Sequence, residues 1–117
     1  MDASCLGRRF KAPVSSRRSV ADTIAANLRP TDTVARLGGD EMAVIMPDTE
    51  IATARQIAAR LVAAIGGLRL GKGSAMITVS IGMATLAAAS DDAEALMSRA
   101  DAALYRAKHL GRNRVAA

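Results

Sequence analysis

Near its middle the chain reads Asp32-Thr-Val-Ala-Arg-Leu37, then Gly38-Gly39-Asp40-Glu41, then Met42-Ala-Val-Ile-Met46, and this stretch decides the fold. Its first and last parts are short apolar runs, and the part between them begins with two glycines. Two apolar runs joined by a tight, glycine-containing connection are typical of a β-hairpin. The stretch therefore predicts two antiparallel strands with Gly38 to Glu41 at the turn.

A helix is predicted on each side of this hairpin. Before it, apolar residues recur every four positions over residues 18–28, and Pro30 then ends the helical region. After it, Asp48 or Thr49 can cap a helix that ends at Gly66-Gly67. The apolar faces of these two helices consist of Val20, Ile24, Leu28, Ile51, Ala54, Ile57, Leu61 and Ile65.

One more strand and one more helix complete the pattern. Apolar residues alternate with small or polar ones from Met76 to Met83, which predicts a strand with one buried face. Ser90 or Asp91 then starts a last helix, whose apolar stripe runs to Ala107 and which Gly111 ends. The order helix, strand, strand, helix, strand, helix predicts an α+β fold in which helices pack on a largely antiparallel sheet.

Composition restricts the class of protein. A chain of 117 residues forms one domain, and a formal net charge of +5 favours anionic partners such as nucleotides, nucleic acids or acidic lipids. The single cysteine excludes a disulfide framework. Because no run of about 18 apolar residues occurs, we expect no membrane insertion by this chain and a cytoplasmic location.

The turn of the hairpin is a candidate site for a metal and phosphate. Gly38 and Gly39 let a ligand approach the backbone closely, since neither residue has a Cβ atom. Asp40 and Glu41 offer two adjacent carboxylates, which are hard oxygen ligands suited to Mg²⁺ and, through it, to nucleotide phosphates. An ordinary hairpin explains these four residues equally well, because Gly-Gly-Asp is common turn chemistry.

Three motifs follow one another along the chain in a specific order and spacing. They are Arg36-Leu-Gly-Gly-Asp-Glu with Met42-Ala-Val-Ile-Met-Pro, then Ser80-Ile81-Gly82, then Arg99-Ala-Asp101-Ala-Ala-Leu-Tyr105-Arg-Ala-Lys108-His-Leu-Gly111-Arg112-Asn113. Together they resemble the GGDEF family of diguanylate cyclases, from about Val20 to Val115. The family's fold resembles the palm of nucleotide cyclases and polymerases. Its members join two GTP molecules into cyclic di-GMP.

The resemblance implies roles for the hairpin residues. Gly38 and Gly39 would lie against the substrate nucleotide. Asp40 and Glu41 would hold Mg²⁺ or Mn²⁺ and assist deprotonation of the 3′-hydroxyl group. Because each of two facing domains brings one GTP in this family, a homodimer would be needed for any catalysis.

Two cations near the end of the last helix, Lys108 and Arg112, would by the same resemblance neutralise the terminal phosphates of GTP. Asp101, Tyr105, Lys108 and Arg112 step by four, three and four residues, which forms a stripe distinct from the apolar one. Without the family, these cations are typical of a solvated helix C-terminus, where the helix dipole favours positive charge.

A second candidate site is Arg29-Pro30-Thr31-Asp32, just before the hairpin. Its aspartate precedes Gly38 by six residues, the family's spacing for the RxxD inhibitory site that binds cyclic di-GMP. Arginine can pair with phosphate or with guanine N7 and O6, while aspartate accepts from guanine nitrogens. Arg60 stands where many relatives supply a further arginine. The alternative is a local Arg–Asp pair in a helix-ending turn.

Residues 1–17 depart from the family pattern. They hold several cations and one acidic residue, Asp2, whereas the family has an aspartate-rich strand and a helix with guanine contacts there. We therefore describe residues 1–17 as a basic arm and residues 18–117 as a partial GGDEF domain that lacks the usual first strand and helix. The gap in the sheet is filled by the arm or by a second copy, or it leaves the fold marginal. We expect the chain to be inactive alone.

Three functions are compatible with these observations. The first is an enzyme module that acts on GTP. The second is a degenerate module that binds cyclic di-GMP through Arg29 and Asp32 or contacts partner proteins. The third is a nucleic-acid binder, which the sequence disfavours because it has no interleaved aromatic residues and no helix-turn-helix or zinc pattern.

Overall fold

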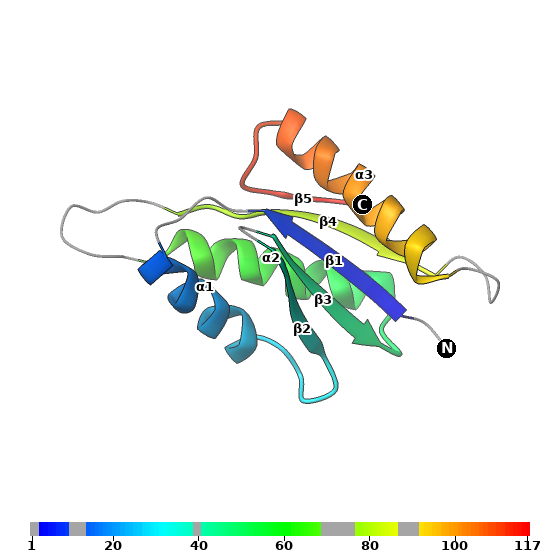
Figure 1. Cartoon of the computed structure of the whole chain (residues 1–117), viewed down its shortest axis with the longest axis horizontal. Helices are drawn as coiled ribbons and strands as arrows, with labels where there is room; N and C mark the ends of the chain where they lie inside the picture. The colour runs from blue at the N-terminus through cyan, green and yellow to red at the C-terminus, as the bar shows by residue number, and fades with distance from the viewer. Residues whose placement is uncertain (1–2, 10–13, 39–40, 69–76, 87–91) are drawn as a thin grey trace.

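The structure is a computed structural model that describes residues 3–9, 14–38, 41–68, 77–86 and 92–117. The elements in these ranges are β1 (Ala3–Arg9), α1 (Val14–Ala26), β2 (Thr33–Gly38), β3 (Glu41–Pro47), α2 (Ile51–Gly66), β4 (Ser80–Thr85), α3 (Ala93–His109) and β5 (Val115–Ala116). The strands form one sheet in the order β2-β3-β1-β4-β5, in which β5 runs parallel to β4 and the other pairs are antiparallel (Figure 1). The predicted α+β fold with a largely antiparallel sheet is confirmed.

The central strand of the sheet comes from the N-terminal segment. β1 pairs with β3 on one side and with β4 on the other, so that Ser4 lies opposite both Met46 and Thr85. The expectation that residues 1–17 form an arm and that this strand is missing is corrected here, because β1 occupies residues 3–9 and α1 begins at Val14. The physical reason is that β3 and β4 would otherwise each keep a row of unpaired backbone groups inside the sheet. Of the three alternatives given for the gap in the sheet, the structure shows the first, in which the chain's own N-terminal segment fills it.

Helices cover both faces of the sheet. α1 and α2 pack against each other and, with alternate residues of β3 and β4, enclose the main core; α3 lies across the opposite face (Figure 1). β4 is therefore buried on both faces, where the alternation of its sequence predicted one. The main core consists of Val20, Ile24, Met42, Val44, Met46, Ala54, Ile57, Ala58, Leu61, Ile65, Ile77, Val79, Ile81 and Met83.

Gly82 allows α3 to lie unusually close to β4. A Cβ atom at this position would lie 2.2 Å from the carbonyl oxygen of Ala100 and 2.2 Å from the backbone nitrogen of Leu104. Any side chain at residue 82 would therefore push the helix away from the sheet. The glycine of the Ser80-Ile81-Gly82 motif thus allows α3, at whose C-terminal end Lys108 and Arg112 lie, to pack closely on the sheet.

The helices begin at residues other than those predicted. α2 starts after Glu50, whose side chain makes no capping hydrogen bond, while the buried Thr49 donates its hydroxyl to the carbonyl oxygen of Pro47 at 2.9 Å. α3 starts after Asp92, whose carboxylate accepts from the amide of Ala95 at 2.7 Å. Ser90 and Asp91, the predicted starts, lie outside the described residues. Across the described segments, we find no helix with both the length and the apolar character needed to cross a bilayer.

Candidate functional site

The predicted hairpin is formed by β2 and β3. At its end Gly38 is in register with Glu41, after an irregularity in the pairing of the two strands. Gly38 has a φ of 141°, a backbone conformation that residues with a side chain rarely adopt. Gly39 and Asp40, the other two residues predicted for this site, lie outside the described residues.

Four segments of the chain meet at the hairpin's edge of the sheet. Glu41 is in register with Arg9 at the end of β1, and Arg9 is in register with Ser80 at the start of β4. The backbone amide of Asn113, just after α3, donates to Ser80 Oγ at 3.3 Å. Because neighbouring strands lie about 4.8 Å apart, the backbones of Glu41 and Ser80, which are separated by one strand, lie about 10 Å apart along this edge.

Lys108 and Arg112 lie at the C-terminal end of α3. Lys108 is partly buried in the last turn of the helix, and Arg112 is exposed in the turn that follows it. That turn is held to the helix by the amide of Arg112, which donates to the carbonyl oxygen of Ala107 at 3.0 Å. The end of α3 that carries the two predicted phosphate-binding cations is thus joined through Asn113 to Ser80, at the same edge of the sheet as Glu41.

The other two members of the predicted polar stripe on α3 are solvent-facing. Asp101 is exposed, and Tyr105 is 65% exposed, with its ring centroid 4.1 Å from that of His109. The stripe is therefore separate from the buried apolar face of α3, as its spacing predicted.

The carboxylates described at this edge do not make up a complete magnesium site. Glu41 is the one acidic residue among the strand ends that the structure describes here, and no residue of Ala3–Arg9 is acidic. The residue in register with Glu41 on β1 is Arg9, so this position adds no carboxylate to the edge. In the described parts of the chain, no three His, Cys, Asp or Glu side chains gather as metal ligands.

Arg29 and Asp32 bind each other at the end of α1. Arg29 Nη2 lies 2.9 Å from Asp32 Oδ1 and its Nε lies 3.2 Å from Oδ2, while the Arg29 amide donates to Oδ2 at 2.9 Å. Arg29 Nη2 also donates to Thr49 Oγ1. The Asp32 side chain is 0% exposed and that of Arg29 is 40% exposed. This is the local pair that the sequence left open as the alternative.

The pair also determines the charge state of Asp32. Burial raises the pKa of this carboxyl group, but the hydrogen bonds and the charge of Arg29 outweigh burial, so the pKa lies below its ordinary value. The hydrogen bond to Asp32 in turn raises the pKa of Arg29. A guanine base would have to displace Arg29 to reach the carboxylate of Asp32.

Arg60 lies beside the same helix end. Its Nη2 on α2 donates to the carbonyl oxygen of Asn27 at 3.0 Å, two residues before Arg29. The three residues of the second candidate site, Arg29, Asp32 and Arg60, are therefore grouped around the end of α1.

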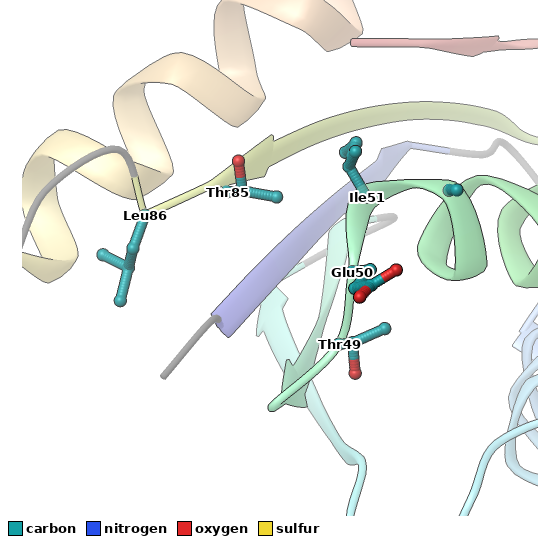
Figure 2. A pocket seen from close by; sticks show the side chains of 6 residues that line it. Thr49, Glu50, Ile51, Thr85 and Leu86 are labelled. Carbon is teal, nitrogen blue, oxygen red and sulfur yellow. The ribbon is translucent and has the colours of Figure 1, made fainter.

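Two pockets lie away from the hairpin's edge, and Thr49, which lines the first of them, also accepts a hydrogen bond from Arg29 of the second candidate site. One of about 330 Å³ separates the start of α2 from the end of β4 (Figure 2), and one of about 430 Å³ adjoins it beside α3. β4 runs from the hairpin's edge at Ser80 to the pockets at Thr85, so the pockets lie at the other end of the sheet. Their lining residues are Thr49, Glu50, Ile51, Ala52, Thr85 and Leu86 for the first, and Ile51, Met83, Ala84, Thr85, Arg99, Ala102, Arg106 and Ala117 for the second.

Sequence reasoning missed two features of the hairpin's edge. It assigned Arg9 to an arm, and it used Ser80 as a motif residue without a contact. The position of Ser80 in a three-residue motif beside Gly82 was a signal that it mattered. No local pattern placed Arg9 opposite Glu41, because that pairing joins residues 32 positions apart in the sequence.

Comparisons with known proteins agree on one family. The family model described as "Diguanylate cyclase, GGDEF domain" matches residues 18–114. The response regulator PleD of Caulobacter vibrioides is 41% identical over 102 residues, which cover 84% of this chain and 22% of that protein. The diguanylate cyclase DgcP of Pseudomonas aeruginosa is 41% identical over 98 residues, which cover 82% of this chain and 14% of that protein. The chain thus spans less than a quarter of the length of either relative.

Solved structures share the fold over almost the whole chain. The active GGEEF domain of a diguanylate cyclase from Vibrio cholerae has a TM-score of 0.89 at 20% identity, over 99% of this chain and 82% of that one. The GGDEF domain of DgcB from Caulobacter crescentus, in complex with c-di-GMP, has a TM-score of 0.88 at 26% identity, over 98% of this chain and 77% of that one.

Proposed function

Because this chain belongs to the GGDEF family of diguanylate cyclase domains, we propose that it acts in cyclic di-GMP signalling as a domain that does not condense GTP by itself. One observation carries the proposal: the central strand β1, whose last residue is in register with Glu41, has no acidic residue. A metal that activates a hydroxyl group for attack on phosphate needs several oxygen ligands. Here β1 supplies no acidic residue to join Glu41.

The same edge keeps features suited to holding nucleotide phosphates. Lys108 and Arg112 lie at the end of α3 that Asn113 joins to Ser80, and charge-assisted hydrogen bonds from such cations to phosphate are among the stronger polar contacts. By resemblance, Gly38 and Gly39 face the nucleotide, and Asp40 and Glu41 are the residues toward which Mg²⁺ or Mn²⁺ would be drawn. GTP is then held mainly through its phosphates.

The proposed lack of cyclic di-GMP synthesis is tested by incubating the chain at high concentration with GTP and either Mg²⁺ or Mn²⁺. Cyclic di-GMP is then measured by chromatography. We expect no product above a protein-free blank, and the same result for Glu41→Gln. Steady turnover by the wild type that Glu41→Gln abolishes would refute the proposal.

The phosphate contacts are tested by calorimetry with GTP. Arg112→Ala is expected to bind about 10-fold more weakly, because it removes a hydrogen bond to a charged group. Arg55→Ala is the matched control, since Arg55 is also an exposed arginine but lies on α2. Equal affinities of Arg112→Ala and the wild type would remove Arg112 from the site.

Binding of cyclic di-GMP at Arg29, Asp32 and Arg60 is the second candidate function. The grouping of both arginines at the end of α1 favours it, as does the likeness to the DgcB domain solved with c-di-GMP. The carboxylate of Asp32 is already bonded to Arg29. We therefore propose that cyclic di-GMP contacts the arginines first and that the Arg29–Asp32 pair then separates so that guanine can bind.

Calorimetry with cyclic di-GMP tests this second function. Arg60→Ala is expected to weaken binding about 10-fold with little change in folding, since Arg60 is exposed. Arg29→Ala is expected to weaken it further, and Arg55→Ala not at all. Equal affinity in the wild type and Arg29→Ala would exclude this site.

We also propose a cytoplasmic location and, for any residual catalysis, a homodimer. A lone cysteine fits a reducing compartment, and the family's reaction joins two domains that each bring one GTP. Sedimentation with and without GTP checks the dimer, and a chain that stays monomeric at high concentration would contradict it.

A further inference from the structure

The chain adopts an uncommon backbone conformation directly after α3. Gly111, Arg112 and Asn113 have φ angles of 118°, 61° and 50°. Glycine adopts positive φ freely and asparagine tolerates it, but for arginine it costs conformational energy. Such a conformation persists where surrounding contacts enforce it, and it often marks a functional position.

Contacts within the turn give it its shape. The amide of Arg112 donates to the carbonyl oxygen of Ala107 at 3.0 Å, and Arg114 Nε donates to the carbonyl oxygen of Arg112 at 3.0 Å. The Arg114 side chain lies against Gly111, where a Cβ atom would be 2.8 Å from its Nη2. These contacts join the turn to the helix end and to itself.

Two further contacts join the turn to the sheet. The amide of Ile81 donates to the carbonyl oxygen of Arg114 at 3.0 Å, just beyond the turn. Within the turn, the amide of Asn113 donates to Ser80 Oγ at 3.3 Å. Ser80 is 4% exposed, and buried hydroxyl groups are retained where they make hydrogen bonds. Ser80 is itself fixed in the sheet by its pairing with Arg9.

We propose that Ser80 is a positioning residue that anchors the turn of residues 111–113 to the sheet, and thereby places Arg112 beside the hairpin for binding of a nucleotide's terminal phosphate. The proposal rests on the proposed function, in which Arg112 contacts phosphate. It concerns Arg112 and not Lys108, because Lys108 lies within the helix and keeps its place without the turn. The ligand class is a nucleoside triphosphate.

The test is the affinity for GTP, measured by calorimetry on the whole chain. Ser80→Ala is expected to weaken binding about 5-fold, the size of one lost hydrogen bond. In the Arg112→Ala background the same change has no further effect, whereas in the Lys108→Ala background it still weakens binding about 5-fold. Ser80→Thr keeps the hydroxyl group and restores affinity. Ser98→Ala, at an exposed position on α3, is the matched control and binds as the wild type does.

Each outcome bears on a different claim. Wild-type affinity in Ser80→Ala, with weaker binding in Arg112→Ala, overturns the positioning role and leaves the phosphate site standing. Additive losses in the double variant also overturn it, since they indicate a general structural role. Wild-type affinity in Arg112→Ala removes the phosphate site and the positioning role together. If Ser80→Ala does not fold, Ser80→Cys replaces it, because a thiol keeps the volume but accepts hydrogen bonds weakly.

Discussion

Both carboxylate oxygens of Asp32 are bonded to Arg29, and the Asp32 side chain is closed off from solvent. Through Thr49, which accepts from the same guanidinium, the pair connects the end of α1 to the residues just before α2. The Arg-x-x-Asp motif is therefore a structural joint as well as a candidate ligand site.

The joint predicts an order of stabilities. Arg29→Ala leaves a buried carboxylate without its partner and lowers the Tm most, while Arg29→Lys lowers it less because an ammonium group cannot bind both oxygens side by side. Arg29→Ala combined with Asp32→Ala is more stable than Arg29→Ala alone. Thermal unfolding followed by circular dichroism checks the order. A double variant less stable than Arg29→Ala would contradict the role of the stranded carboxylate.

The lowered pKa of Asp32 predicts acid sensitivity. Because the folded state holds the ionised form, the stabilisation is complete above the ordinary pKa of 3.8 and is lost as the pH falls from there through the lower folded value. Urea unfolding between pH 6 and about pH 2.5 measures it. Asp32→Asn is expected to be less stable at pH 6 and to show a flatter dependence. Parallel curves for the two proteins would show that other groups cause the acid sensitivity.

Gly82→Ala is expected to destabilise the domain by at least about 3 kcal/mol, because its Cβ atom would meet backbone atoms of α3, which cannot rotate away as a side chain can. Gly66→Ala is the matched control. It adds a Cβ with nothing within 4 Å at the end of α2, so it is expected to change stability by less than about 1 kcal/mol. Chemical denaturation compares the two, and equal effects would argue against the close approach of α3.

Asp92→Ala tests the start of α3. Loss of the bond from its carboxylate to the amide of Ala95 is expected to cost about 1 kcal/mol. Glu50→Ala, at the corresponding position of α2 where no side-chain cap exists, is expected to cost nearly nothing. The difference is read from urea midpoints. If both variants lose the same stability, Asp92 does not cap the helix.

Cys5→Pro tests the central position of β1. Cys5 lies opposite Ile45 on one side and Ala84 on the other, so it is inside the sheet. Proline has no amide hydrogen to donate to a neighbouring strand and is not tolerated at such a position. We expect Cys5→Pro to abolish cooperative unfolding and Cys5→Ala to preserve it. A stable, cooperatively folded Cys5→Pro protein would support the N-terminal arm that the sequence first suggested.

Local patterns were enough to predict much of this fold. The hairpin, α2 and the core faces of the helices followed from periodicity and from glycines, because each depends on residues close together in the sequence. Ile51 is an exception: it was placed on the apolar face of α2 but is exposed at the helix start. The grouping of Glu41, Lys108 and Arg112 in one nucleotide site came from the family motifs and stays a prediction.

The features that the sequence did not reveal depend on distant partners. β1 lacks alternation, and its identity as a strand comes from two neighbours whose edges it completes. β5 has two residues and exists through its pairing with β4. The burial of both faces of β4 follows from the docking of α3, whereas the alternation within β4 predicts only one buried face.

The placement of β1 has a consequence for folding during translation. This strand is synthesised before either neighbour, so Ser4 can pair first with Met46 and only later with Thr85. At elongation rates of about 5 to 20 residues per second, roughly 4 to 16 s pass before the second neighbour is synthesised. During that interval the backbone N–H and C=O groups of β1 lack their native strand partners and can pair with another chain. The yield of native domain is therefore expected to depend on translation speed and on chaperones that shield nascent chains.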